Sequence, residues 1–193
     1  NYYDGTTYNI DSMIYDRSTY FVTVENGGAY PTEAVDTVQA IPTKGASGWE
    51  HFIVGGQHFL VGANQYDGSN FNIDSVVYKY NAESSSDPFQ SFQTISTKGA
   101  YDWEHFVIGD EHFLVVANYK DGSNYNLGSV VYKYNAERSS DPFQSFQTIP
   151  TKGANDWEHF VIGDEHFLVV ANQRDGSNYN IDSVVYQYDA ARS

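Results

Sequence analysis

The stretch WEHFVIGDEHFLVVAN, residues 103–118, decides the fold of this 193-residue chain. It occurs again without change at residues 157–172 and in a looser form at residues 49–64, so the tryptophans that open the three copies are 54 residues apart. A fixed period of this kind is typical of repeat proteins, in which a unit cannot bury its apolar face alone. We therefore expect one repeat domain over residues 1–193. It would consist of a degenerate partial unit at 1–40 and three units at 41–94, 95–148 and 149–193.

The local pattern within one unit predicts β-strands. The candidate strands of the second full unit are residues 103–108, 112–117, 129–134 and 143–149. Gly109 with Asp110, and Asp121 with Gly122, supply turn signals between them. The first two strands are nearly continuous apolar runs and the last alternates with Gln and Ser, as inner and outer strands do. Four strands per unit at this period indicate an all-β fold, a β-propeller of four-stranded blades, with a flat meander or a sandwich as the alternative.

Composition excludes several classes of protein. The chain has 10 Lys and Arg against 25 Asp and Glu, a formal net charge of -15, and it would repel phosphate backbones and anionic lipid. We therefore expect no nucleic-acid partner. No apolar run approaches the roughly 18–20 residues of a membrane helix, so we expect no membrane insertion. Cysteine is absent, which removes thiol catalysis, cysteine–zinc sites and disulfides. The first residues, Asn1 to Asp4, have no signal-peptide pattern, so we expect that, if the protein is secreted, its leader has already been removed.

Further motifs recur with the tryptophans. Residues 153–158 read Gly-Ala-Asn-Asp-Trp-Glu and residues 167–172 read Phe-Leu-Val-Val-Ala-Asn, with close copies at 99–104 and 113–118. These motifs resemble the EAR (epitempin, or EPTP) repeat. Two departures are Gly48 in place of the Asp before the tryptophan, and an interruption at residues 20–24. The resemblance implies a seven-bladed propeller in secreted, extracellular recognition proteins that are not enzymes, some of which bind cell-surface receptors.

The number of repeats implies an incomplete ring. Full-length members of the family carry about twice as many repeats, so this chain would supply about half a propeller. Its strands predict a partial opening blade, two full blades and a closing blade without its outer strand, which leaves edges and apolar faces open. We expect a homo-oligomer, a dimer closing one ring, in which the strand at residues 35–41 completes the partner's last blade. The alternative is a fragment of a longer protein.

Acidic residues flank the tryptophans of the inner strands. In a ring these positions converge, and like charges at close range need a cation or shifted pKa values. Oxygen ligands suit calcium, so one prediction is a calcium site formed by Asp102, Asp156, Glu104 and Glu158. The alternative is that these acids accept hydrogen bonds from backbone amides between blades.

The segments Asp-Gly-Ser-Asn at 67–70, 121–124 and 175–178 favour turns over calcium loops, because they lack the downstream Glu and central Gly of an EF-hand. Each is followed by an aromatic residue and an asparagine, a combination that suits sugar binding. The predicted ligand-binding residues are Phe71, Asn72, Tyr125, Asn126, Tyr179 and Asn180. They would repeat once per blade and give multivalent glycan binding.

All six histidines occur in pairs, of which His105 and His112 are one. The hairpin between them predicts a shared face, with backbones about 7–8 Å apart as diagonal neighbours. No third ligand accompanies a pair, so a structural histidine bonded to backbone or carboxylate is favoured over a shared metal. Every histidine is triplicated whereas an active site is normally unique, so we expect no enzyme.

The sequence therefore predicts a non-catalytic, extracellular binding protein that recognises a protein or another surface partner. Two alternatives remain open. One is a lectin that uses the repeated Tyr and Asn turns. The other is a carrier of a small hydrophobic ligand or pigment at a seam between subunits.

Overall fold

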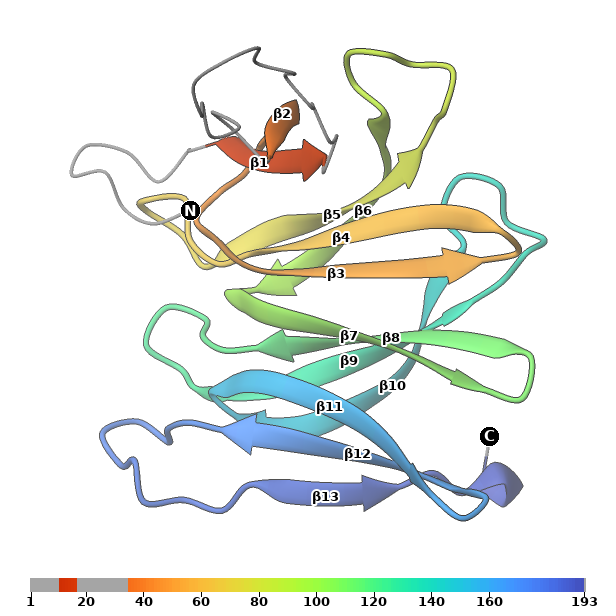
Figure 1. Ribbon diagram of the computed structural model, residues 1–193. Helices are drawn as coiled ribbons and strands as arrows, with labels where there is room; N and C mark the ends of the chain where they lie inside the picture. Colours follow the sequence, from red (N-terminus) through yellow and green to blue (C-terminus); the bar gives the residue numbers. More distant parts are fainter. Residues whose placement is uncertain (1–10, 17–34, 193) are drawn as a thin grey trace, which may run out of the picture.

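The computed structural model describes residues 11–16 and 35–192, and these residues form an all-β structure (Figure 1). The predicted interruption at residues 20–24 lies outside them. The strands are β1 (Asp11–Asp16), β2 (Asp36–Pro42), β3 (Ala46–Val54), β4 (Gln57–Asn64), β5 (Asn72–Tyr80), β6 (Phe89–Lys98), β7 (Ala100–Ile108), β8 (Glu111–Asn118), β9 (Asn126–Tyr134), β10 (Phe143–Lys152), β11 (Ala154–Ile162), β12 (Glu165–Asn172) and β13 (Val184–Gln187). A short 3-10 turn, Ala190–Arg192, follows β13.

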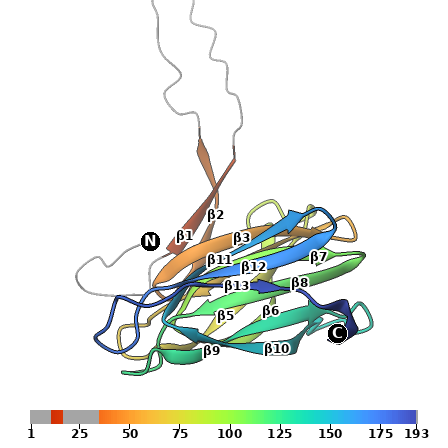
Figure 2. The same ribbon diagram turned by 90° about the horizontal axis from the view of Figure 1, so that it is seen from below.

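Four antiparallel sheets follow one another along the chain. We call β1–β2 the opening pair, β3–β6 the first blade, β7–β10 the second blade and β11–β13 the last blade. In each blade the strands pair in chain order, so every blade is a meander with its tryptophan strand at one edge. The sheets stack as an open arc in which β3, β7 and β11 lie next to one another (Figures 1 and 2). The prediction of propeller blades in about half a ring is confirmed.

The hairpin turns follow from glycine. Gly109 joins β7 to β8 with a φ of 61°, a left-handed conformation that costs other residues energy. Gly163 takes the same conformation one unit later, with a φ of 63°. The apolar runs on both sides of these turns can therefore fold back directly on each other as neighbouring inner strands.

The apolar core lies between blades. One buried cluster joins the first and second blades, and another joins the second and last blades. Trp103 and Trp157 are each only 1% exposed at these interfaces, whereas Trp49 of the first blade is partly buried. The indole Nε1 of Trp157 also donates a hydrogen bond to the backbone oxygen of Val116 in the second blade, at 3.2 Å.

The outer strands share one register. Ser75 lies opposite Ile95 in the first blade, Ser129 opposite Ile149 in the second, and Ser12 opposite Ile41 in the opening pair. The strand predicted near residues 35–41 is therefore β2, and it occupies the outer position beside β1 of the same chain. Among the residues that the structure describes, β13 pairs with β12 and with no other strand.

Candidate binding site at the open side of the last blade

Phe143, the first residue of β10, shows how two neighbouring blades are joined at their outer strands. Its ring is 2% exposed and meets Phe52 and Phe59 of the first blade edge-on, with centroids 5.5 and 6.4 Å away. Gln93 of β6 holds its backbone from the first blade as well. Its Nε2 donates to the Phe143 oxygen at 2.8 Å, and its Oε1 accepts from the Phe143 N–H at 3.0 Å. One aromatic ring and one amide thus anchor β10 to the preceding blade.

The same amide contact occurs one unit earlier. Gln39 of β2 donates to the oxygen of Phe89 at 2.9 Å and accepts from its N–H at 2.8 Å. The glutamine recurs 54 residues after Gln93 as Gln147, which is exposed on β10. A third contact of this kind would need an outer strand on the last blade.

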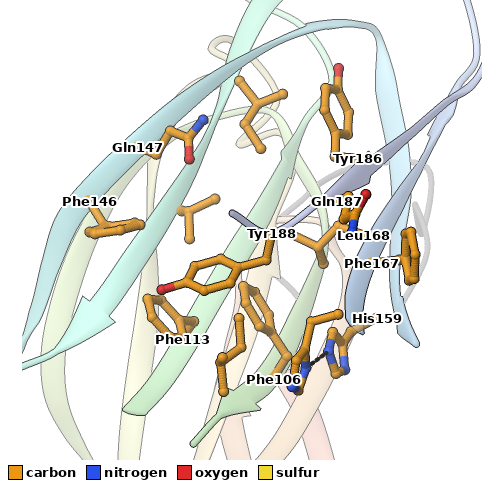
Figure 3. Close-up of a pocket in the computed structure, with 14 residues that line it drawn as sticks. Phe106, Phe113, Phe146, Gln147, His159, Phe167, Leu168, Tyr186, Gln187 and Tyr188 are labelled. Carbon is orange, nitrogen blue, oxygen red and sulfur yellow. Dashed lines mark hydrogen bonds between the residues drawn. The ribbon is translucent and has the colours of Figure 1, made fainter. Parts of the chain in front are cut away.

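A pocket of about 100 Å³ lies between the second and last blades (Figure 3). If the last blade had an outer strand, the aromatic residue equivalent to Phe143 would lie in this pocket. Its lining includes Phe106, Phe113, Gln147 and Tyr188. Each of these is 54 residues after a residue that holds Phe143, namely Phe52, Phe59, Gln93 and Tyr134. The pocket is therefore the equivalent of the Phe143 site, and we call it the aromatic socket.

Apolar side chains that are buried in the second blade are exposed in the last one. Val131 is 4% exposed because the last blade covers it, whereas Val185, its equivalent on β13, is 58% exposed. Ile162 at the end of β11 is also exposed. The socket thus adjoins an apolar sheet face and an edge of β13 that pairs with no strand in the described part of the chain, a combination that indicates an interaction site.

The inner acids make contacts between blades. Glu104 Oε1 accepts a hydrogen bond from the backbone N–H of His159 at 3.0 Å. Burial, together with the charges of Glu50 and Glu158, raises the pKa of Glu104 to about 7, although the hydrogen bond from His159 lowers it. Burial and the hydrogen-bonded, like-charged Asp156 likewise raise the pKa of Asp102 to about 7.

The structure does not bring the four predicted calcium ligands together in one cluster. It brings Asp102 and Asp156 into contact and directs Glu104 to the backbone of His159, whereas Glu158 is exposed. Within residues 11–16 and 35–192, no group of three or more histidine and acidic side chains is arranged to hold a metal ion. The amide contact of Glu104 matches the alternative interpretation of these acids, and the calcium site stays a prediction.

The histidine pairs share a face, as predicted, but each histidine bonds its partner rather than backbone or carboxylate. His105 Nε2 and His112 Nδ1 are 3.1 Å apart, and the other two pairs have a distance of 3.0 Å. His105 also stacks on Phe52 of the first blade, with ring centroids 4.9 Å apart. Burial, together with the neighbouring histidines, lowers the pKa of His105 to about 4.

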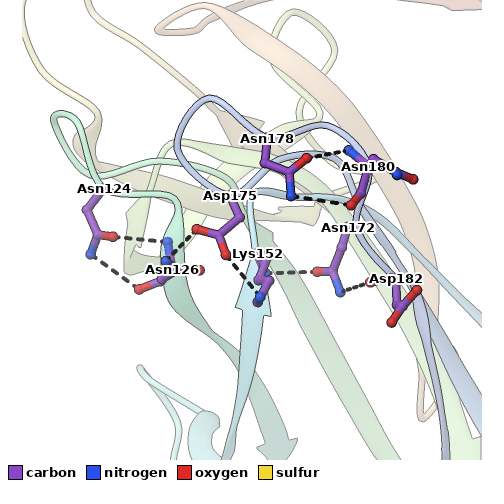
Figure 4. A network of polar contacts seen from close by, with 8 residues as sticks. All are labelled: Asn124, Asn126, Lys152, Asn172, Asp175, Asn178, Asn180 and Asp182. Atoms are coloured by element: carbon purple, nitrogen blue, oxygen red, sulfur yellow. Dashed lines mark hydrogen bonds and ion pairs between the residues drawn. The ribbon is translucent and has the colours of Figure 1, made fainter.

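The Asp-Gly-Ser-Asn turns also link adjacent blades (Figure 4). Asp175 accepts a hydrogen bond from Asn126 Nδ2 at 2.8 Å and pairs with Lys152 Nζ at 2.9 Å. These two contacts hold the pKa of Asp175 below its usual value, the lysine having the larger effect. Asp121 makes the same two contacts, with Asn72 and Lys98.

The aromatic residues beside these turns stack with cations. Arg174 lies over Tyr125 at 4.2 Å and over Tyr179 at 4.8 Å, and Lys120 lies over Phe71 at 4.5 Å. Tyr125 is only 8% exposed, whereas Tyr179 is 63% exposed. Of the predicted glycan-binding residues, Phe71, Asn72, Tyr125 and Asn126 take part in contacts between blades, whereas Tyr179 and Asn180 are exposed on the last blade. The glycan site stays a prediction.

Sequence reasoning missed the Gln and Phe residues of the outer strands. The motif Phe-Gln-Ser-Phe-Gln-Thr-Ile recurs 54 residues apart in β6 and β10, and this was the signal available. The structural role of this motif is visible only in the fold, where Gln93 bonds the backbone of Phe143, 50 residues away in another blade. No helix among the described residues is long and apolar enough to span a membrane.

An open arc of antiparallel meanders, two of four strands and a last one of three among the described residues, defines a propeller-type repeat module. The chain belongs to the EPTP domain family, whose model matches residues 36–81, 89–135 and 143–189. This confirms the resemblance to the EAR repeat.

Two similar proteins are the thrombospondin-type laminin G domain and EAR repeat-containing proteins of Mus musculus and Homo sapiens. The mouse protein is 37% identical, over 78% of this chain and 30% of its own length. The human protein is 46% identical, over 77% of this chain and 22% of its own length. The chain therefore spans less than a third of these relatives. Among solved structures, a GH43_1 enzyme from Xanthomonas citri complexed with xylotriose matches 64% of this chain and 39% of its own, at 11% identity and a TM-score of 0.45.

Proposed function

We propose that this chain is a non-catalytic binding module that attaches to another polypeptide by accepting one of its β-strands beside β13. The observation that carries this proposal is the aromatic socket, whose walls repeat the residues that hold Phe143. Strand addition obtains affinity from main-chain hydrogen bonds and specificity from side-chain pockets. The edge of β13 that is unpaired among residues 11–16 and 35–192 would supply the main-chain hydrogen bonds, and the socket with Gln147 would supply the side-chain pocket.

The size of the socket favours a side chain over a free ligand. Sites for small molecules usually measure roughly 300–1,000 Å³, whereas this pocket has about 100 Å³. A hydrophobic carrier would need additional space at a seam with another molecule. A lectin role has one supporting observation, the exposed ring of Tyr179 beside Asn180. It would then have one accessible aromatic site on the last blade rather than one per blade.

We further propose that the module acts outside the cell as a recognition protein. The support is its membership of the EPTP domain family and its similarity to proteins named for a thrombospondin-type laminin G domain. The partner class that fits the socket is a protein with an extended segment bearing an aromatic residue.

A synthetic peptide with the sequence of β10, Phe143–Lys152, tests strand acceptance. Titration of the 193-residue chain, followed by NMR chemical shifts, should show saturable binding with the largest changes around β13 and the socket. A matched peptide with alanine in place of its first phenylalanine should bind about tenfold more weakly or worse, because it loses the burial of one aromatic ring. Equal binding of the two peptides, or of a scrambled one, would contradict the proposal.

A further inference from the structure

The three histidine pairs are a feature that every blade repeats and that strand acceptance does not explain. They contain all the histidines of the chain, namely His51 with His58, His105 with His112, and His159 with His166. In each pair one residue lies on the tryptophan strand and the other on the next strand, so the pair spans a single hairpin. The sequence favours backbone or carboxylate partners for these rings, whereas the structure joins the two rings to each other.

The facing nitrogens of a pair have the separation that two ligands of one metal ion need. Nε2 of His105 and Nδ1 of His112 are 3.1 Å apart, and the matching atoms of the other two pairs are 3.0 Å apart. Two nitrogens that each lie about 2.0–2.1 Å from one ion are about 2.9 Å apart at a right angle and about 3.4 Å apart at the tetrahedral angle. The observed separation falls between these two values, so the hairpin already provides the spacing.

A neutral pair can supply two nitrogen ligands without losing a proton. In a neutral imidazole one ring nitrogen carries a hydrogen and the other has a lone pair. Only one of the two facing nitrogens of His105 and His112 can carry a hydrogen at 3.1 Å, so the other presents its lone pair. A change of tautomer moves the hydrogen of the donor ring to its other nitrogen. A turn of both rings then directs two lone pairs at the same ion.

Packing between blades orients these rings but leaves them open to solvent. The ring of His105 stacks on Phe52 of the first blade with centroids 4.9 Å apart, and the ring of His159 stacks on Phe106 of the second blade at 5.2 Å. His105 and His112 both stay partly exposed, so an ion in solution can reach the facing nitrogens. The second-blade pair is thus held in place where two blades meet.

The donor atoms select the class of ion. Imidazole nitrogen suits Cu²⁺, Zn²⁺ and Ni²⁺, whereas Ca²⁺ prefers oxygen ligands. We propose that each histidine pair binds one Cu²⁺ ion, with water at the remaining positions. Cu²⁺ fits best because it accepts nitrogen and oxygen ligands at right angles and has the highest affinity of these ions for such a site. The net charge of -15 also attracts cations. Two protein ligands are fewer than a closed site has, so the ion should exchange with a chelator.

Copper titration of the 193-residue chain tests this proposal, because the paired histidines are its only imidazoles and it has no cysteine. Electron paramagnetic resonance with CuSO₄ at neutral pH should show saturation at three equivalents per chain, one for each pair. The nitrogen couplings should correspond to two imidazoles around each copper, and EDTA should remove the signal. Binding without imidazole, or with one imidazole per copper, would overturn the proposal.

Two single variants locate the bound ions. His112→Gln removes a ligand from the partly exposed pair and His58→Gln removes one from an exposed pair, so each should reduce the imidazole-bound copper by one third. His58→Gln protects the test against misfolding, because both rings of its pair are exposed. Asp110→Asn, in the exposed turn beside His112, is the control and should keep all three equivalents. An excess of CaCl₂ should leave the copper signal unchanged. Undiminished copper binding in both histidine variants, or displacement by calcium, would overturn the proposal.

Discussion

Glu104 on the inner strand of the second blade accepts a hydrogen bond from the backbone N–H of His159 on the inner strand of the last blade, with 3.0 Å between Oε1 and N. The same carboxyl group is half-buried and has a pKa of about 7, so it changes its charge near neutral pH. The contact that joins two blades is thus made by a titrating group.

Removal of this acceptor should destabilise the stack. Glu104→Ala leaves the His159 N–H without its partner and should lower the free energy of unfolding by about 1–3 kcal/mol. Glu104→Gln keeps an acceptor oxygen and should cost less. Urea unfolding at neutral pH measures both, with Glu137→Ala in an exposed loop as the control, which should stay within about 0.5 kcal/mol of the parent chain. Equal stability of Glu104→Ala and Glu137→Ala would contradict the assigned contact.

The pair of Asp102 and Asp156 predicts a pH dependence. The pKa of Asp102 is about 7 in the folded chain against a reference value of 3.8, so between these values the folded form holds a proton that the unfolded form has released. The contribution of Asp102 to the free energy of unfolding therefore falls as pH rises toward 7. Above pH 7 the folded form carries the full cost of the buried charge. Asn cannot ionise. The free energy of unfolding of Asp102→Asn, measured relative to that of the parent chain, should therefore increase by about 1–2 kcal/mol when the pH is raised from about 5 to about 8.

Urea unfolding of both proteins at the two pH values measures this difference. The titration of His105 occurs in both proteins and cancels in the comparison. A stability difference that does not change with pH would show that Asp102 is not the group responsible.

The two buried tryptophans should respond differently to the same substitution. Both are 1% exposed, but Trp157 Nε1 bonds the oxygen of Val116 whereas Trp103 Nε1 has no partner in the structure. Trp157→Phe should therefore cost about 1 kcal/mol more than Trp103→Phe, because the loss of ring volume is common to both. Thermal unfolding of the two variants compares them directly, and a larger loss for Trp103→Phe would refute this assignment.

The blades could be predicted from sequence because their determinants are local or strictly periodic. The apolar run that begins at Trp103, the Gly109 turn and the 54-residue spacing together indicate meanders of four strands. The strand near residues 35–41 and the open last blade followed from counting the same pattern.

The contacts between blades could not be predicted in the same way, because they join residues of different units. Gln93 meets Phe143, and Asn72 meets Asp121, about one period further along the chain. The amides predicted to bind glycan therefore serve in the second case as a link between blades. The histidine partners were missed because the ring nitrogens of His105 and His112 approach to 3.1 Å, closer than backbone spacing alone suggests.

Amide hydrogen exchange in β13, Val184–Gln187, most directly tests whether the last blade accepts a strand beside β13. With saturating β10 peptide these amides should be as protected as residues 130–133 of β9, which has a strand on each side. Without the peptide they should exchange faster, while β9 keeps its protection. Exchange in β13 that is fast and unchanged by the peptide would contradict the account.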